Sequence, residues 1–267
     1  MRSLLFIIVM ALAPAASQAA EVSVLADEKD KPIAYQAAPG EVNKVRAGAP
    51  AGIANQLRVS DPGIPVTVAA TASSCTSEST AGFLCTGGPK LFIVLLDDGD
   101  DVFAGSASAT VFMVEGGIGE DVIRNASQAQ GDDGDDTLVA PGADSILDGN
   151  DGDDILTGYL GEDIIGGGAG ADRIRGGGGR DEARGGDGND VIDGGPGQDR
   201  IYGEKGNDKL SVGAGAANFA DGGAGRDTIN ARNRQRDRIN CGPGRGDVAT
   251  VDEVDRVRNC ETVRIRR

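Results

Sequence analysis

The sequence predicts an all-β protein whose central part is a parallel β-roll solenoid, with an N-terminal β region and a disulfide-closed C-terminal cap. The main observation is that residues 149–211 consist of one nine-residue unit repeated seven times without a gap. The second is composition, because 43 of the 267 residues are glycine and only 3% are aromatic. A short fixed period with one apolar residue per unit is typical of stacked repeats, in which each unit packs only on its neighbours.

Three positions of the nine-residue unit are nearly invariant in type. The seven units read GNDGDDILT, GYLGEDIIG, GGAGADRIR, GGGGRDEAR, GGDGNDVID, GGPGQDRIY and GEKGNDKLS. Position four is always glycine, position six is always aspartate and position eight is aliphatic. The aliphatic residues are Leu156, Ile165, Ile174, Ala183, Ile192, Ile201 and Leu210. The pattern is the nonapeptide G-G-x-G-x-D-x-U-x.

Each constant position has a physical reason. Glycine permits positive φ, so the first half of the unit can turn tightly with its carbonyls directed at one point. The aspartate adds a hard charged oxygen, which suits Ca²⁺ with its 6–8 oxygen ligands at about 2.3–2.6 Å. The segment x-U-x is a short strand with its apolar residue inward. One unit is then half a coil, and eighteen residues complete a coil that stacks about 4.8 Å from the next.

This geometry places the aspartates of alternate units on the same edge of the solenoid. One edge is expected to carry Asp154, Asp172, Asp190 and Asp208, and the other Asp163, Asp181 and Asp199. The repeats resemble the hemolysin-type (RTX) calcium-binding repeats of secreted bacterial proteins. The resemblance implies that several Ca²⁺ ions are held by the position-six aspartates and by backbone carbonyls of the turns. It extends less securely to Asp121, Asp136 and Asp227 in imperfect units. The alternative, a disordered Gly/Asp-rich linker, does not explain an aliphatic residue at every ninth position.

The charge of the chain is concentrated in its middle. Residues 91–211 hold 27 acidic and 8 basic residues, a net charge of −19, within a whole-chain net charge of −16. Residues 1–90 hold 7 of each, and residues 226–267 hold 11 basic and 7 acidic residues. The middle repels itself and is expected to bind divalent cations. Such a surface is a poor partner for nucleic acid.

The first nineteen residues predict a secretory signal peptide. Arg2 is followed by the apolar run LLFIIVMALA, and Ser17-Gln18-Ala19 suits cleavage after Ala19 or Ala20. The run is short for a membrane span, although an uncleaved anchor is the alternative. No later segment is apolar enough to insert into a membrane. Many RTX proteins are exported by an uncleaved C-terminal signal instead, so this chain departs from that pattern and a toxin-like role is in doubt.

Residues 20–90 contain no nonapeptide and predict short strands separated by Gly/Pro turns, of a related solenoid type. Cys75 and Cys85 lie in the segment SSCTSESTAGFLC. In an exported protein two nearby cysteines favour a local disulfide, whereas a metal site would need more ligands and the chain has no histidine.

Residues 91–148 predict an irregular continuation of the right-handed roll, which is expected to run from about residue 91 to 240. The units LDDGDDVFA, GGIGEDVIR and GDDGDDTLV fit the repeat, but other runs between them break the register. Asp121 therefore lies in an isolated unit, and its site is expected to be incomplete. Fewer calcium sites are expected here than in residues 149–211.

Residues 212–267 predict degenerate repeats and a cap. VGAGAANFA has Ala217 at position six and is expected to keep Phe219 inside, whereas GGAGRDTIN restores the aspartate at Asp227. The unit RNRQRDRIN keeps an aspartate at Asp237 but replaces every turn glycine, and the arginine there suggests a strand pair without calcium. The ending, with its D-x-V-x-x-x-C-E-x-V pattern, resembles the closing segment of secreted bacterial calcium-binding repeat proteins. A Cys241–Cys260 disulfide there would stabilise the protein by roughly 3 kcal/mol and cover the end of the stack. The arginine-rich tail could instead bind a polyanion.

The residue types exclude several enzyme classes. With no histidine, the chain cannot build an HExxH zinc site, a Ser-His-Asp triad or a Cys-His pair. A glycosidase-type carboxylate pair is possible by residue type, but the acids recur at ligand spacing and there is no tryptophan to hold a sugar. We therefore expect a secreted, extracellular, non-enzymatic protein that binds calcium ions and folds on binding them. The alternatives are an adhesion or matrix protein that uses the roll as a spacer, with a cell-envelope or self-association partner, and a carboxylate-based hydrolase.

Overall fold

The computed structural model describes strands β1 to β7 in the N-terminal region and then residues 91–96, 99–104, 111–215 and 217–265. The described residues are all-β, as predicted, and contain no helix. No helix long and apolar enough to cross a membrane is therefore found in this part of the chain. The predicted signal peptide lies outside the described residues.

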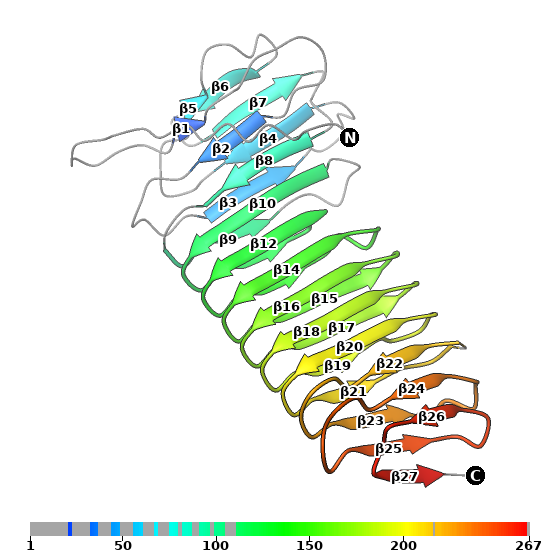
Figure 1. The fold of residues 1–267 in the computed structure, drawn as a ribbon. Helices are drawn as coiled ribbons and strands as arrows, with labels where there is room; N and C mark the ends of the chain where they lie inside the picture. The colour runs from blue at the N-terminus through cyan, green and yellow to red at the C-terminus, as the bar shows by residue number, and fades with distance from the viewer. Residues whose placement is uncertain are drawn as a thin grey trace, which may run out of the picture.

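The described strands form two sheets that share one axis (Figure 1). The first sheet contains β1 (Glu21–Val22), β2 (Ile33–Gln36), β5 (Thr67–Val68), β8 (Leu91–Leu95), β10 (Val111–Ile118), β12 (Gln128–Asp133), β14 (Ile146–Asp151), β16 (Ile164–Ala169), β18 (Glu182–Asp187), β20 (Arg200–Lys205), β22 (Phe219–Asp221), β24 (Arg238–Asn240) and β26 (Arg256–Arg258). The second contains β3 (Lys44–Gly48), β4 (Gln56–Ser60), β6 (Cys75–Ser79), β7 (Gly82–Thr86), β9 (Val102–Ala104), β11 (Val122–Arg124), β13 (Thr137–Val139), β15 (Ile155–Leu160), β17 (Arg173–Gly178), β19 (Val191–Asp193), β21 (Lys209–Ser211), β23 (Thr228–Ala231), β25 (Val248–Val251) and β27 (Thr262–Ile265).

From β8 onward the chain alternates between the two sheets, so that neighbouring strands of one sheet come from alternate repeats. From β8 and β9 onward every neighbouring pair is parallel. In the regular run the register is eighteen residues, as in the pairs Leu156–Ile174 and Ile165–Ala183. Two units therefore make one coil, which confirms the predicted solenoid.

The core is a narrow column between the two sheets. All seven position-eight residues of the regular run are buried with at most 2% of their surface exposed. Their neighbours in the strands point outward, as the alternating burial of β16 and β17 shows. Because each strand contributes one aliphatic residue, the apolar core is thin compared with that of a globular domain.

The irregular segment before residue 149 keeps the same stack. β10 and β12 pair in parallel with each other, and β12 pairs with β14, which spans the boundary at residue 149. Phe103, Ile123 and Leu138 occupy the core positions of β9, β11 and β13. The strands therefore stack continuously across residue 149.

The N-terminal region continues the stack for one coil and then changes. β2 pairs in parallel with β8, and β3 with β9. Beyond them β3, β4, β7 and β6 pair antiparallel, which differs from the solenoid type expected for this region. The register places Cys75 directly opposite Cys85, and the disulfide between them stays a prediction.

The C-terminal coils contain an inserted residue that corrects one expectation. Ala217 adopts φ 64° as an extra residue in its turn, so that Asn218 takes the place of the aspartate and Ala220 enters the core. The expectation that Phe219 lies inside is wrong. Its ring lies outside the buried column, with its centroid 5.6 Å from that of Tyr202. The predicted Cys241–Cys260 disulfide is confirmed, and its Cα atoms lie 5.0 Å apart.

Candidate metal sites along two carboxylate ladders

The position-six aspartates are buried at the start of each strand, and each accepts a hydrogen bond from the coil before it. The backbone N–H of Asp154 donates to Asp172 Oδ1 at 2.8 Å, and that of Asp172 donates to Asp190 Oδ1 at 2.9 Å. One carboxylate oxygen of each aspartate thus links two coils. The same bond repeats along both edges, and we call the two series the first and second ladders.

The first ladder runs along the edge that leads into the second sheet. Its members are Asp101, Asp121, Asp136, Asp154, Asp172, Asp190, Asp208, Asp227, Asp247 and finally Glu261. The second ladder runs along the opposite edge. Its members are Ser145, Asp163, Asp181, Asp199, Asn218, Asp237 and Asp255. The aspartates predicted to share an edge do so.

Three features of the ladders were not expected from the sequence. Asp121 is not isolated, because its backbone N–H donates to Asp136 Oδ1 at 2.7 Å and its own Oδ1 accepts from Asp101 at 2.7 Å. The break in the repeats that we expected upstream of residue 149 lies on the second edge, where Ser145 stands in place of an aspartate. Asp247 was missed because Gly246 is inserted before it, which shifts it from position six.

The second carboxylate oxygen of most of these aspartates lies beside a backbone carbonyl oxygen of the next coil, and we call this pair of oxygens the cradle. At Gly167, an added Cβ would overlap both Asp172 Oδ2 and the carbonyl oxygen of Gly185 in the next coil. Most position-one glycines from Gly116 to Gly203 meet the corresponding pair of oxygens. A carboxylate oxygen next to a carbonyl oxygen is a pair of hard oxygen ligands of the kind that Ca²⁺ takes.

Within the described part of the chain, these Oδ2 atoms are buried without a hydrogen-bond donor. They belong to Asp121, Asp136, Asp154, Asp163, Asp172, Asp181, Asp190, Asp199, Asp208, Asp227 and Asp247. A buried charged oxygen without a partner costs several kilocalories per mole unless a counter-charge is present. All ten predicted ligands are in this set, although their role as metal ligands stays a prediction.

Burial makes the ionised form of the aspartates unfavourable without a cation. Desolvation raises the pKa of Asp136, Asp163, Asp172 and Asp208 to about 7. The same cause raises the pKa of Asp121, Asp154, Asp199 and Asp227 to about 6. Hydrogen bonds from the backbone oppose the shift only in part. The edges therefore attract protons or cations.

A cation here would rely on backbone oxygens as well as carboxylates. Among the described residues, no group of three His, Cys, Asp or Glu side chains converges on one point. Successive aspartates of a ladder are one coil apart, so the remaining ligands must come from carbonyls of the glycine-rich turns. This is the donor set that the resemblance implied.

Comparison with protein-family models decides the family of these repeats. The model of the RTX calcium-binding nonapeptide repeat matches four times, at residues 130–174, 166–201, 184–216 and 212–233. The chain carries RTX calcium-binding repeats. No curated protein matches the chain significantly.

The RTX repeats also carry an outer ladder at position five that sequence reasoning missed. Asp135 Oδ1 accepts from the backbone N–H of Asp153, and Asp153 Oδ1 accepts from Ala171, at 2.8 and 2.7 Å. Asn189 and Asn207 form the same kind of bond further along the edge, at 2.8 Å. These side chains are exposed and accept from the following coil, whereas the inner aspartates accept from the preceding one. The signal was the frequent Asp, Glu or Asn at position five.

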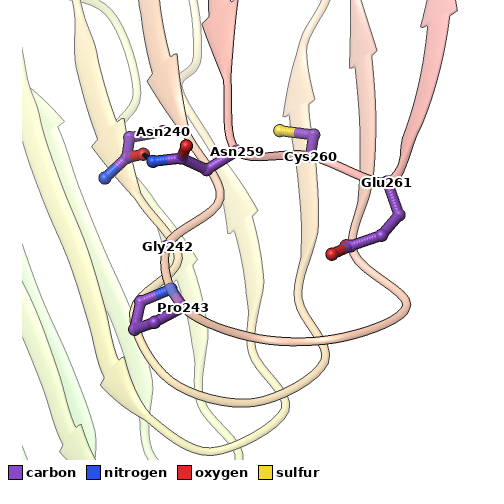
Figure 2. Close-up of a pocket in the computed structure, with 6 residues that line it drawn as sticks. All are labelled: Asn240, Gly242, Pro243, Asn259, Cys260 and Glu261. Atoms are coloured by element: carbon purple, nitrogen blue, oxygen red, sulfur yellow. Dashed lines mark hydrogen bonds between the residues drawn. The ribbon is translucent and has the colours of Figure 1, made fainter.

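A shallow hollow lies beside the last RTX coils and is lined by Asn240, Gly242, Pro243, Asn259, Cys260 and Glu261 (Figure 2). The Asn259 amide faces Asn240 and donates to its Oδ1 at 2.7 Å. Glu261 Oε2 accepts from the backbone N–H of Asp247 at 3.0 Å, which lowers the pKa of the Glu261 carboxyl. Glu261 is thus used to end the first ladder, and Cys260 is in the disulfide.

Proposed function

We propose that this protein is a secreted, non-enzymatic calcium-binding protein whose RTX repeats complete their fold when Ca²⁺ binds along the two ladders. The observation that supports this is the series of buried Oδ2 atoms without a donor, most of them beside a backbone carbonyl oxygen. Ca²⁺ supplies the missing positive charge and accepts the mixed carboxylate and carbonyl ligands.

The energetics favour coupling of folding to binding. The net charge of −19 in residues 91–211 opposes compaction, and one buried aliphatic residue per strand contributes only about 1.5–3 kcal/mol. A ligand that binds the folded state alone adds its binding free energy to stability. Calcium is scarce inside cells and abundant outside them, so export through the predicted signal at residues 1–19 would deliver the chain to the place where it folds.

The proposed domain division follows the ladders. Residues 149–211 form the regular roll, because both edges carry aspartates there. Residues 91–148 have aspartates on the first edge, and residues 212–267 replace part of the second ladder and close the stack. Residues 20–90 are kept as a separate N-terminal β region after the signal.

A calcium titration followed by far-UV circular dichroism tests the proposal. We expect weak β signal in calcium-free buffer and a cooperative gain on adding Ca²⁺. Mg²⁺ should substitute poorly, because it demands a tight octahedron and loses its waters reluctantly. A calcium-free spectrum identical to the calcium-loaded one would contradict coupled folding.

The elongated stack gives a second candidate function some support. Figure 1 shows the coils stacked along one direction from β10 to β27, a shape that suits a spacer between two attachment points. In this version the protein is an adhesion or matrix component at the cell envelope. Calcium-dependent retention of the purified protein on isolated envelopes would support it, whereas the simple calcium-binding role predicts no retention.

A further inference from the structure

In two turns near the C-terminal end of the second ladder, side-chain amides lie among the oxygens. Asn233 Nδ2 donates to the carbonyl oxygens of Gly213 and Gly215 at 3.0 Å each, and to Asp237 Oδ2 at 2.9 Å. In the same turns Asn218 takes the ladder position and its Nδ2 donates to Gly215 O at 3.1 Å.

These three acceptors are of the kind that face a cation elsewhere in the roll. Two are carbonyl oxygens of a glycine-containing turn, and the third is the Oδ2 atom of a ladder aspartate in the next coil. The corresponding Oδ2 atoms of Asp163, Asp181 and Asp199 are buried without a donor, whereas Asp237 Oδ2 has one in Asn233. The nitrogen of Asn233 is therefore at the point where three oxygens converge.

We propose that Asn233 is a built-in replacement for a calcium ion, so that the turn between Asn218 and Asp237 forms without metal. The proposal rests on the proposed function, because it assumes that the other turns hold Ca²⁺. The amide offers two N–H donors with partial positive charge, which the three acceptors share, and the neighbouring ladder member, Asn218, carries no charge.

The surroundings of Asn233 hold its amide in place. Asp252 Oδ2 accepts from the backbone N–H of Asn233 at 2.8 Å and also from that of Arg234. Asn233 Oδ1 accepts from the backbone N–H of Gln235 at 2.8 Å. The amide is thus fixed on both sides before any metal is present.

Counting bound ions tests the proposal directly. Native mass spectrometry of the full chain in excess Ca²⁺ should show one more ion in Asn233→Gly than in the wild type, because the three oxygens then face a vacant point. Asn259→Gly is the matched control, since the Asn259 amide donates only to a side chain, and its count should equal that of the wild type. If all three proteins bind the same number of calcium ions, the proposed role of Asn233 is overturned, whereas the proposed function is not. A wild type that binds no calcium would overturn the proposed function.

Hydrogen exchange on the wild type provides a second test that needs no variant. In calcium-free buffer the backbone amides of Asn218 and Arg238 should exchange more slowly than those of Asp163 and Asp181. All four donate between coils along the same edge. Equal, fast exchange at all four would contradict a metal-free turn around Asn233.

Discussion

Each ladder aspartate has two separable tasks, one for each carboxylate oxygen. Oδ1 of Asp190 accepts the backbone N–H of Asp172 and so joins two coils. Oδ2 lies in the oxygen cradle and is available to a cation. Asparagine preserves the first task and removes the second, as Asn218 shows within the second ladder.

Asp190→Asn and Asp190→Ala should therefore differ. In Asp190→Asn we expect about one calcium ion fewer and a higher calcium midpoint, but calcium-free stability at neutral pH that is unchanged or improved, because a buried charge is gone. Asp190→Ala also leaves the Asp172 N–H without an acceptor, which should lower the free energy of unfolding by a further amount of about 1–3 kcal/mol. Urea unfolding with and without Ca²⁺ measures both effects. Identical behaviour of the two variants would show that Oδ1 contributes nothing.

Position two of the repeat requires positive φ, and Tyr159 adopts it at 71° where many other units have glycine. Its side chain is 57% exposed, so little packing is lost on its removal. Left-handed backbone costs a residue with a Cβ about 1–2 kcal/mol, partly offset by the greater unfolded-state entropy of glycine.

Tyr159→Gly is accordingly expected to raise the free energy of unfolding by up to about 1 kcal/mol in calcium. Thr157→Gly, two residues earlier in β15 and outside the positive-φ set, should lower it. Urea denaturation of the calcium-loaded proteins gives both values. A destabilising Tyr159→Gly would mean that the exposed ring makes contacts that outweigh the backbone strain.

At the scale of the turn, adjacent glycines have different tasks. An added Cβ at Gly167 would overlap Asp172 Oδ2 and Gly185 O, whereas one at Gly166 would meet Asp148 Oδ1 at 3.2 Å with no backbone nearby. Neither residue has positive φ. The two glycines therefore differ in that only a Cβ at Gly167 would enter the cradle.

Gly167→Ala should greatly weaken calcium-induced folding, and Gly166→Ala should change it little. The expected shift of the calcium midpoint in circular dichroism is several-fold for Gly167→Ala. For Gly166→Ala it is within a factor of two, which corresponds to about 0.4 kcal/mol. Equal midpoints would show that the cradle around Gly167 does not take part in binding.

Prediction from the sequence succeeds where the nine-residue period is intact and fails where one residue is inserted into a turn. An exact spacing of eighteen residues between alternate units was enough to place Asp154 and Asp172 on one edge. At Ala217 and Gly246 a single extra residue in a turn is absorbed locally, so counting by nine misassigns Phe219 and overlooks Asp247. The contacts of the Asn233 amide could not be predicted from the sequence, because they depend on how two coils pack against each other.

At the scale of the whole molecule the two edges are unequal. The first ladder carries an acid at every coil from Asp101 to Glu261, whereas the second starts at Ser145 and is interrupted by Asn218 between Asp199 and Asp237. On the proposed function, cations are expected along the first edge and in the middle of the second, whereas Asp237 Oδ2 already has a donor in Asn233. The disulfide-closed end, where one edge is already satisfied by amides, requires the least metal.

The buried carboxylates also make calcium-free stability depend on pH in an unusual direction. The pKa of Asp136, Asp163, Asp172 and Asp208 is raised to about 7 in the folded protein, against about 3.9 for an unfolded aspartate. Between these values the folded state binds more protons than the unfolded state, so stability without calcium is greatest at low pH and is lost as pH rises towards 7. Protons here replace the missing cations.

Acidification should thus partly substitute for calcium. In metal-stripped buffer of constant ionic strength, the far-UV β signal should be stronger at about pH 5.5 than at about pH 7.5, since most of these carboxyls are then protonated in the folded state. In saturating Ca²⁺ the trend should weaken or reverse, because protons compete with the ion for the same oxygens. Light scattering at each pH separates folding from association near the sequence pI of 4.4. A calcium-free β signal that grows as pH rises would mean that the ladder carboxylates are stabilised by something other than protons or cations.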